Sequence, residues 1–407
     1  MGVKQVLNLC FFENNLRAWI QPKIAKYCIT RVVKKKGNDK IKVAFVVQLS
    51  ETCWDKQVDI FDEMISNSEF EVKLLVVPKI IEGCISSYEN NFFIEKYPNY
   101  CIKVVENNKI IKIKNLKFDY VFFPRPYDFY LPKGVRSVDL VKFTRCCYIP
   151  YGYSLSDSFN DCNIDSPFFD NIYMEFTESD YIRSLLYKRY KKTCEKSIKH
   201  FEYLGYPCLR KYLEINSSSK IETITWTPRW SYDVKHGGSN FIEYKDKFID
   251  FCRKLPRNIK VIFRPHPMMF DELVSKQLIT EQDRYEYIEK LNNLNIKIDI
   301  NSSIDVILKE TDLLITDFSS IIIQFFLTKK PIIYCKKNIE FNESGKKLEK
   351  FMYETHSWDE VENCCFKLID GDDVLLTERQ KFIEQEFCDI EDSAKKIVDR
   401  IIKDYRS

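Results

Sequence analysis

Leu313-Leu314-Ile315-Thr316-Asp317-Phe318-Ser319-Ser320 is the stretch of this sequence that most clearly indicates how the chain folds. Its apolar start predicts a short buried strand, and its two serines open the apolar run from Ile321 to Leu327, which predicts a buried helix. A strand that turns directly into a helix is the repeating unit of a parallel sheet with crossover helices. The stretch therefore predicts an α/β fold.

Further apolar runs, each ending in a polar turn, repeat this pattern along the chain. They lie at 43–47, 72–77, 120–123, 224–226, 260–263, 296–300 and 331–334. Helical patterns lie between several of these runs, which favours parallel strands joined by helices. Because 407 residues are too many for one ordinary core, we predict two doubly wound α/β domains.

The composition excludes several classes of protein. A net charge of +3 is too small for a typical nucleic-acid-binding domain. The chain has 10 glycines and neither a G-x-x-x-x-G-K-[ST] nor a G-x-G-x-x-G loop. Its 15 cysteines form no C-x-x-C pair and it has 4 histidines, so we expect reduced thiols in the cytoplasm and no metal site. No apolar run reaches the length of about 18 residues that a membrane-spanning helix needs.

Residues 1–40 differ from the rest because lysine and arginine far outnumber the acidic residues there. The apolar residues between Val3 and Phe11 fall near helical spacing, so we predict a basic amphipathic helix. Two interpretations stay open. Residues 1–36 could lie on an anionic membrane surface, as a peripheral protein of the inner face, or form a solvated helix packed on its own domain.

Three polar clusters follow predicted strands in the second half of the chain. They are Thr227-Pro228-Arg229-Trp230, Arg264-Pro265-His266-Pro267 and Thr316-Asp317-Phe318-Ser319-Ser320. The carboxyl ends of parallel strands meet at one edge of a sheet, where open α/β sheets bind ligands. Serines at a helix start suit phosphate oxygens, arginine can hold a diphosphate with two hydrogen bonds, and histidine can donate to a phosphate. Each cluster also has a plain structural interpretation, such as helix capping, a tight turn or a surface salt bridge.

With these clusters, the sequence resembles the CDP-glycerol glycerophosphotransferase family of teichoic acid enzymes. The resemblance rests on residues 225–230, 264–267, 316–320 and 330–334, and on Tyr203-Leu204-Gly205-Tyr206-Pro207. It implies a GT-B fold, with two Rossmann-like doubly wound α/β domains facing a cleft and a basic N-terminal helical extension. It also implies transfer of glycerol phosphate, or a related polyol phosphate, from a CDP-linked donor to a hydroxyl of a lipid-linked or polysaccharide acceptor in cell-wall or capsule polymer synthesis.

The resemblance assigns a role to each part of the chain. We expect a basic helical segment at 1–40, an acceptor-side domain at 41–210, a donor-nucleotide domain at 211–380 and C-terminal helices at 381–407. The residues expected to contact the donor are Thr227, Arg229, His236, Arg264, His266, Thr316, Asp317, Ser319 and Ser320. His236 could instead belong to an ordinary surface loop. His266 is also expected to act in catalysis, and we predict no metal or other cofactor.

The acceptor side departs from the family pattern. Family members of the teichoic type use a His-Gly pair there, whereas the counterpart here reads Tyr151-Gly152-Tyr153-Ser154, so the general base cannot be carried over. Gly152, Tyr153 and Ser154 are expected on the acceptor side, and Asp157 and Asp128 are candidate bases that also fit turn or capping positions. Two other functions stay open: a GT-B glycosyltransferase that uses a nucleotide sugar, and a non-catalytic nucleotide-binding subunit.

Overall fold

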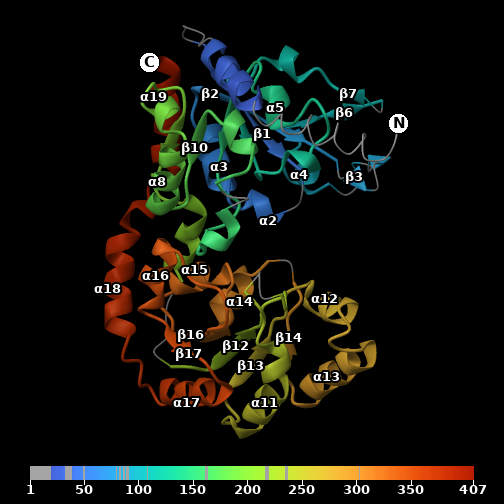
Figure 1. Ribbon diagram of the computed structural model, residues 1–407, viewed down its shortest axis with the longest axis vertical. Coiled ribbons are helices and arrows are strands. Elements are labelled where there is room, and N and C mark those ends of the chain that lie inside the picture. The colour runs from blue at the N-terminus through green and yellow to red at the C-terminus, as the bar shows by residue number, and fades with distance from the viewer. Residues whose placement is uncertain are drawn as a thin grey trace, which may run out of the picture. The chain divides into compact units, whose positions relative to one another are not determined.

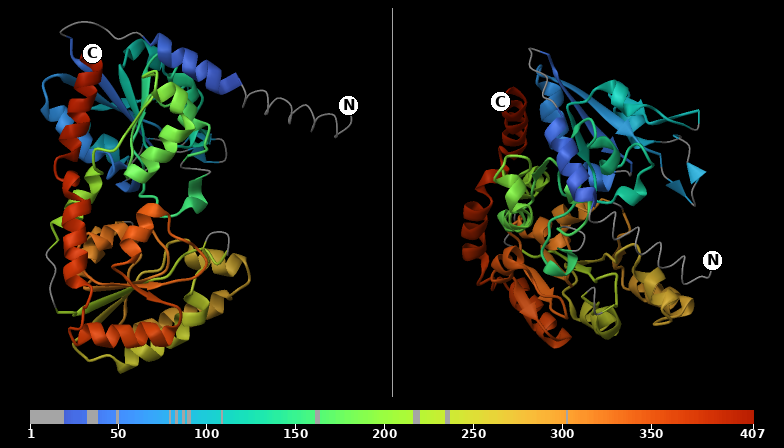
Figure 2. Two further views of the ribbon diagram at one scale, coloured as in Figure 1. Left: turned by 60° about the vertical axis from the view of Figure 1, so that its left-hand side comes forward. Right: turned by 45° about the horizontal axis from the view of Figure 1, so that its top comes forward.

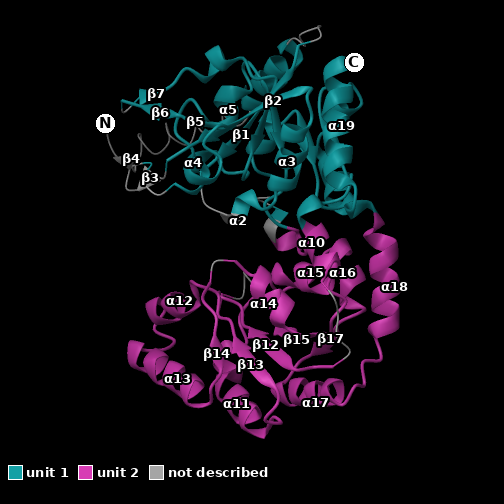
Figure 3. Ribbon diagram, turned by 180° about the vertical axis from the view of Figure 1, so that it is seen from behind, with its two compact units in different colours: residues 1–152, 160–208, 389–407 teal, residues 153–159, 209–388 magenta. Residues whose placement is uncertain are grey.

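The chain forms two compact units in the computed structural model (Figure 3). Unit 1 contains residues 1–152, 160–208 and 389–407, and unit 2 contains residues 153–159 and 209–388. The structure describes residues 20–32, 39–48, 51–78, 80–81, 84–85, 88, 91–107, 109–160, 164–215, 220–233, 237–301 and 303–407. Within the predicted basic segment, residues 20–31 are helical, whereas residues 1–19 and 33–38 lie outside the described part.

Unit 1 is built on a parallel sheet of seven strands, in the order β11-β10-β9-β8-β1-β2-β5. The strands are β1 (Ile41–Val47), β2 (Phe70–Val76), β5 (Cys101–Lys103), β8 (Tyr120–Phe123), β9 (Arg145–Tyr148), β10 (Met174–Phe176) and β11 (His200–Glu202). Val43 pairs with Val72 on one side and with Tyr120 on the other. The central strands are apolar at nearly every position because helices cover both faces of the sheet.

Two helices from opposite ends of the chain cover unit 1 side by side. They are α3 (Val58–Ser66) and α19 (Ser393–Arg406), drawn in blue and red in Figures 1 and 2. Each buries an apolar stripe, with Phe61 in α3 and Ile397 and Ile401 in α19. The other helices that the structure describes in unit 1 are the one at 20–31, α2 (Glu51–Trp54), α4 (Phe92–Lys96), α5 (Ser137–Leu140), α7 (Phe168–Asn171), α8 (Asp180–Arg189) and α9 (Lys191–Cys194).

Unit 2 contains a parallel sheet of six strands in the order β14-β13-β12-β15-β16-β17. The strands are β12 (Thr223–Thr227), β13 (Lys260–Phe263), β14 (Lys297–Ile298), β15 (Leu313–Thr316), β16 (Ile332–Cys335) and β17 (Tyr353–Thr355). Its helices are α10 (Arg210–Leu213), α11 (Phe241–Lys254), α12 (Met269–Ser275), α13 (Glu281–Asn293), α14 (Asp305–Glu310), α15 (Ile321–Phe326), α16 (Glu343–Glu349), α17 (Trp358–Ile369) and α18 (Leu376–Glu386). The helix predicted after Ser320 is therefore present as α15.

The order of the unit 2 strands is that of a Rossmann sheet, because the first strand, β12, lies between the second, β13, and the fourth, β15. Figure 1 shows α11 and α17 on one face of this sheet and α15 and α16 on the other. Trp226 of β12 is fully buried in the core and packs on Phe248 of α11 and Trp358 of α17. This aromatic core fixes the strands whose ends carry the polar clusters.

Two segments differ from the predicted division at 210 and 380. Residues 153–159 belong to unit 2, where Asn342 donates from Nδ2 to the Ser154 carbonyl (3.1 Å) and from its backbone N–H to the Leu155 carbonyl (2.8 Å). Residues 389–407 belong to unit 1 and are not a separate helical segment. The apolar stripe of α19 explains this placement, since the stripe packs on α3.

Candidate functional site

The structure places the three predicted polar clusters after three neighbouring strands of the unit 2 sheet. Arg229 follows β12, Arg264 and His266 follow β13, and Asp317 follows β15. The chain reverses its winding direction between β12 and β15, and this switch point is where doubly wound sheets bind ligands. The clusters therefore share the edge of the sheet that is suited to a ligand.

Asp317 is the centre of a buried hydrogen-bond network at this edge. Its side chain is 1% exposed and accepts from the backbone N–H of Arg229 (2.9 Å) and of Asn240 (3.1 Å), and from the Asn240 side-chain amide (2.8 Å). Burial raises the pKa of Asp317, and these hydrogen bonds act against the rise. Both carboxylate oxygens are engaged by the protein, so we assign Asp317 to positioning the loops in place of the predicted direct contact with a donor.

Thr227 and Thr316 also serve the interior of unit 2. Both are buried, and the Thr227 hydroxyl donates to the Thr316 hydroxyl across 2.8 Å. The Thr316 hydroxyl is within hydrogen-bond distance of the carbonyls of Thr227 (3.2 Å) and Asp317 (2.8 Å). These contacts join the ends of β12 and β15, so the two threonines stabilise the edge of the sheet from its interior. The sequence predicted instead that they contact a donor.

Arg229 is the buried cation of the site. Its Nη1 donates to the Phe318 carbonyl (2.5 Å), and its guanidinium lies over the Phe318 ring at 5.4 Å. Its Nε is buried and makes no hydrogen bond to any residue that the structure describes. Burial lowers the pKa of Arg229, but an arginine keeps its charge at neutral pH. A buried positive charge with an unused N–H group is suited to an anion.

Arg264 is half-buried and directly follows β13, the strand next to β12. It forms an ion pair with Asp299, which is fully buried, and Nη2 donates to the Asn301 carbonyl (2.9 Å). Its backbone N–H donates to the Trp226 carbonyl (2.9 Å), which continues the pairing of β13 with β12. The Asp299 carboxylate fixes the direction of the guanidinium and neutralises part of its charge.

His266 has an exposed side chain whose Nδ1 accepts from the backbone N–H of Met268 (3.2 Å). Partial burial lowers the pKa of His266, and the positive charges of Arg229 and Arg264 lower it further. The imidazole is therefore neutral at pH 7, and the hydrogen bond at Nδ1 places its proton on Nε2. In this form His266 can donate a hydrogen bond from Nε2, but it cannot accept a proton there.

The serines of the third cluster lie nearer to solvent. Ser319 is half-buried and its hydroxyl accepts from the backbone N–H of Ile321 (3.5 Å), while Ser320 is exposed at the start of α15. His236 lies outside the described residues, and the loop resumes at Gly237 and Gly238, both with positive φ. Lys337, which the sequence analysis did not select, follows β16 and donates to the Ser239 carbonyl (2.7 Å).

The predicted acceptor-side residues are divided between the two units. Gly152 ends a segment of unit 1, whereas Tyr153, Ser154 and Asp157 belong to unit 2. Ser154 is buried and Asp157 is exposed at a 3₁₀ turn, Asp157–Phe159. A Cβ at Gly152 would meet no atom within 4 Å, so this glycine is not required for packing.

Asp128 is a capping residue in this structure. Oδ1 accepts from the backbone N–H of Ser137 (2.7 Å), and Oδ2 accepts from the Ser137 hydroxyl (2.7 Å). Burial raises the pKa of Asp128, while these hydrogen bonds act to lower it. The carboxylate satisfies N–H groups at the start of α5, which supports the capping interpretation, and the acceptor-side role of Asp128 stays a prediction.

The switch point of the unit 1 sheet joins Gln48, which the sequence did not single out, to the proline- and aromatic-rich stretch 124–130, which the sequence indicated as a candidate lining of an acceptor cleft. It lies between β1 and β8, which are followed by Gln48 and Arg125, and Arg125 Nη2 donates to Gln48 Oε1 (3.0 Å). The Arg125 guanidinium also lies over the ring of Tyr130 at 4.7 Å. Phe129 is 70% exposed beside them. The prolines and aromatic residues at 124–130 are the sequence signal for this region, but the pairing of Arg125 with Gln48 depends on the strand order of the sheet.

Comparison with known proteins decides the family. Residues 202–403 match the model of the CDP-Glycerol:Poly(glycerophosphate) glycerophosphotransferase family. Residues 202–403 therefore belong to this family. The matched region contains the whole unit 2 sheet with its three strand-end clusters. The family predicted from the sequence is thereby confirmed.

Individual relatives agree with this assignment. The chain is 26% identical over 140 residues to the minor teichoic acid biosynthesis protein GgaB of Bacillus subtilis (strain 168), a match that spans 34% of this chain and 14% of GgaB. The structure is similar to that of the wall teichoic acid polymerase TagF, with a TM-score of 0.54, 15% identity and coverage of 100% of this chain and 99% of that chain. It is also similar to a UDP-N-acetylglucosamine 2-epimerase from Listeria monocytogenes, with a TM-score of 0.55, 10% identity and coverage of 90% and 97%.

These two structures share the fold with this chain at low sequence identity. Together with the two parallel α/β units, they confirm the predicted GT-B type of fold. Among the residues that the structure describes, no helix is long and apolar enough to cross a membrane. The same residues contain no group of three or more histidine, cysteine, aspartate or glutamate side chains placed to hold a metal ion.

Proposed function

We propose that this chain transfers glycerol phosphate, or a related polyol phosphate, from a CDP-linked donor to a hydroxyl of a lipid-linked or polysaccharide acceptor in cell-wall or capsule polymer synthesis. Family membership supports the type of reaction, and the relation to GgaB supports the class of polymer. The observation that carries the proposal is the placing of Arg229, Arg264 and His266 around the switch point of the family-matched sheet.

The donor diphosphate is assigned to this edge because of its charge. Arg229 and Arg264 both lower the pKa of His266, so their positive fields overlap at its imidazole. An anion beside His266 would therefore interact with both guanidiniums at once. Ser319 and Ser320 follow the adjacent strand β15, and their hydroxyls would add neutral donors.

His266 is assigned the role of a neutral hydrogen-bond donor. Its Nδ1 accepts from Met268, so its Nε2–H is the group that can reach a phosphate oxygen. Negative charge grows on the phosphate that leaves during the transfer, and a donor already in place stabilises that charge more than the charge of the bound substrate. Loss of His266 should therefore lower turnover as well as affinity.

The proposed reaction is a displacement at phosphorus. The oxygen of the acceptor hydroxyl forms a bond to the β-phosphorus of the donor, and the bond from that phosphorus to the bridging oxygen breaks. CMP leaves with the bridging oxygen, and the acceptor proton passes to a base. Arg229, Arg264 and His266 would balance the charge on the departing CMP, so the proposal includes no metal.

Asp157 remains the proposed base, with Gly152, Tyr153 and Ser154 as part of the acceptor-side segment. Asp157 is exposed to solvent and follows this segment closely, whereas the Asp128 carboxylate caps α5.

Peripheral attachment to the membrane is proposed through residues 1–36. In the described part of that range, Ile24 and Tyr27 are 43% and 57% exposed beside the exposed residues Lys23 and Lys26, which suits an anionic surface.

A panel of donors tests this function. The protein is incubated with CDP-glycerol, CDP-ribitol, UDP-sugars or GDP-sugars and a lipid-linked acceptor, and the released nucleotide is identified. CMP from a CDP-polyol is the expected product, and Asp157→Asn should bind CDP normally but release CMP more slowly. UDP or GDP from a nucleotide sugar would instead identify a glycosyltransferase, and CDP binding without turnover would identify a non-catalytic subunit.

A further inference from the structure

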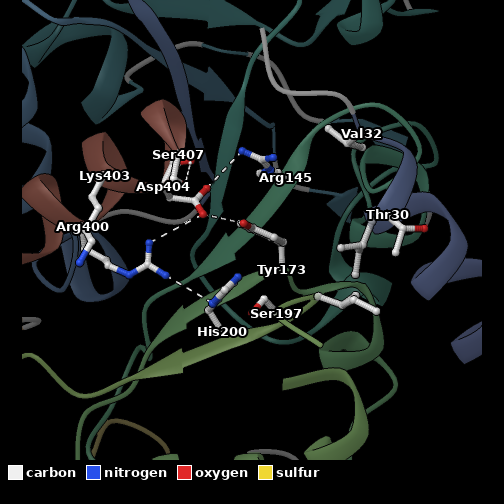
Figure 4. Close-up of a pocket in the computed structure, with 12 residues that line it drawn as sticks. Thr30, Val32, Arg145, Tyr173, Ser197, His200, Arg400, Lys403, Asp404 and Ser407 are labelled. Carbon is white, nitrogen blue, oxygen red and sulfur yellow. Dashed lines mark hydrogen bonds and ion pairs between the residues drawn. The ribbon is translucent and has the colours of Figure 1, made fainter. Parts of the chain in front are cut away.

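A pocket of about 540 Å³ lies within unit 1, at the edge of the sheet opposite to the strand ends discussed above (Figure 4). Arg145 begins β9, Tyr173 directly precedes β10, and His200 begins β11, so the pocket is at the amino ends of these strands. Helix α19 supplies Arg400, Lys403 and Asp404. The proposed transfer reaction uses none of these residues.

Asp404 organises the polar side of the pocket. It is buried and accepts from the hydroxyls of Tyr120 (2.6 Å) and Tyr173 (2.7 Å), and from Arg145 Nη1 (3.1 Å). The Arg145 guanidinium also lies over the Tyr173 ring at 4.8 Å. This buried ion pair holds the arginine in a fixed orientation.

Arg145 has two donor groups, Nε and Nη2, for which the described residues supply no acceptor, and of these Nε is buried. Its side chain is 8% exposed, and neither Nε nor Nη2 donates to any residue that the structure describes. Nε–H and Nη2–H lie on one side of a guanidinium and point in parallel, which matches two oxygens of a phosphate or carboxylate. A buried arginine with this pair of donors unused is suited to bind an anion.

The surrounding charges also favour an anion. Figure 4 shows Arg400 between Asp404 and His200, with its Nη2 3.3 Å from His200 Nδ1. Arg400 is paired with Glu202 and Asp404, which uses its charge within the protein. Lys403 is exposed at the same pocket and adds a further positive charge. Figure 4 shows Lys403 on the far side of Asp404 and Arg400 from Arg145, so Lys403 adds positive charge at the rim and is not a second contact for one phosphate group. The lining has three cationic side chains, Arg145, Arg400 and Lys403, and one carboxylate side chain, Asp404, so a phosphate monoester suits it better than a singly charged carboxylate does.

The rest of the wall combines apolar side chains with the hydroxyls of Thr30, Ser197 and Ser407. Ile29 and Val32 come from the helix at 20–31 and the residue after it, and Ile198 comes from the turn before β11. The cavity is larger than a phosphate group, so the ligand has room for an organic part beside these side chains. A phosphate with a short carbon chain fits both walls.

We propose that this pocket binds an organic phosphate, whose phosphate group interacts with Arg145 and whose carbon skeleton lies against Ile29, Val32 and Ile198. Two sources share this chemistry: a free polyol phosphate, or the headgroup of an anionic phospholipid. The second source is consistent with the exposed apolar and basic residues of the helix at 20–31.

Calorimetric titration with glycerol phosphate, and sedimentation with phosphatidylglycerol vesicles, test the proposal on the full chain. Lys403→Glu should weaken one of these two interactions by about threefold or more, because it reverses a positive charge at the rim of the pocket. Lys395→Glu is the matched control, since Lys395 is exposed on the same helix and does not line the pocket. Loss of glycerol phosphate binding identifies a soluble ligand, and loss of vesicle binding alone identifies a lipid headgroup.

A second variant separates binding from folding. Arg145→Gln combined with Asp404→Asn removes both buried charges together and leaves neither one alone. Its unfolding transition should stay cooperative while binding of the same ligand is lost. The proposal is overturned if neither probe binds, if Lys403→Glu and Lys395→Glu weaken binding equally, or if binding depends on His266 and not on Lys403.

Discussion

The backbone N–H of Arg229 donates to Oδ2 of Asp317 across 2.9 Å, and this contact joins the loop after β12 to the turn after β15. The chain leaves these two strands in opposite directions at the switch point, so their loops would separate without a link. Asp317 supplies that link from a buried position, and it also holds Asn240 at the start of α11. The orientation of Arg229 toward a ligand thus depends on a carboxylate that does not itself need to contact the ligand.

Replacement of Asp317 by asparagine should destabilise unit 2 and weaken CDP binding together. The amide keeps the shape of the side chain but turns one acceptor into a donor among the N–H groups of Arg229 and Asn240. We expect a loss of about 1–3 kcal/mol in the free energy of unfolding, measured by urea denaturation. Asp246→Asn, an exposed residue of α11, should change it by less than ~0.5 kcal/mol. Equal stability of the two variants would contradict the assignment.

The titration of His266 should report on its two arginine neighbours. Its pKa is lowered by partial burial, Arg229 and Arg264, so proton NMR should place its midpoint below the ordinary histidine value of about 6.5. Binding of CDP should raise this midpoint, because the diphosphate adds negative charge next to the imidazole. His266→Gln identifies the resonance. A midpoint that does not move when CDP binds would place the diphosphate elsewhere.

The same shift gives a pH dependence of stability with a defined sign. A histidine whose folded pKa is lowered binds its proton more readily in the unfolded chain. Its contribution to stability is complete above about 6.5, the ordinary value, and is lost as the pH falls through the lowered folded value. The pKa of His200 is also lowered, first by burial and then by Arg400, so both histidines act in the same direction. His266→Gln should flatten the acid side of a plot of unfolding free energy against pH, and an unchanged slope would contradict this assignment.

Gly205 should be required for the packing of the C-terminal segment on unit 1. It has φ of +89°, and a Cβ there would lie 2.6 Å from the Asp389 carbonyl oxygen. Gly371 has the same φ of +89° with no atom within 4 Å of its Cβ, so it is a matched control. Gly371→Ala should cost about 1–2 kcal/mol for the left-handed backbone alone. Gly205→Ala should cost a further ~1–3 kcal/mol because of the overlap, measured by thermal unfolding. A similar loss of stability for both variants would show that residues 389–407 can move to accommodate the added methyl group, and would contradict this prediction.

The sequence predicted the strand ends well because their signals are local. Apolar runs that end at Thr227, Arg264 and Thr316 mark strands. The residues after these runs are polar because the three strands are neighbours in one sheet and end at the same edge. The two α/β halves and the helix after Ser320 followed from the same local patterns.

Other features depend on contacts between distant residues and could not be predicted. Asp317 looked like a ligand contact, but its partner Asn240 lies 77 positions away. The link between Gln48 and Arg125 spans another 77 positions, and α19 shows an apolar stripe without indicating which helix it covers. Burial of a polar side chain against such partners is a property of the fold, and no short motif encodes it.

The central claim is that His266 and the two arginines beside it bind the CDP part of the donor. Calorimetric titration of CDP into the wild-type chain, His266→Ala and His356→Ala tests it most directly, since His356 also follows a strand of unit 2 but is exposed and pairs with Glu354. We expect CDP to bind the wild-type chain and His356→Ala alike, and to bind His266→Ala about tenfold more weakly. Equal affinity for all three proteins, or no binding of CDP to the wild-type chain, would contradict the account.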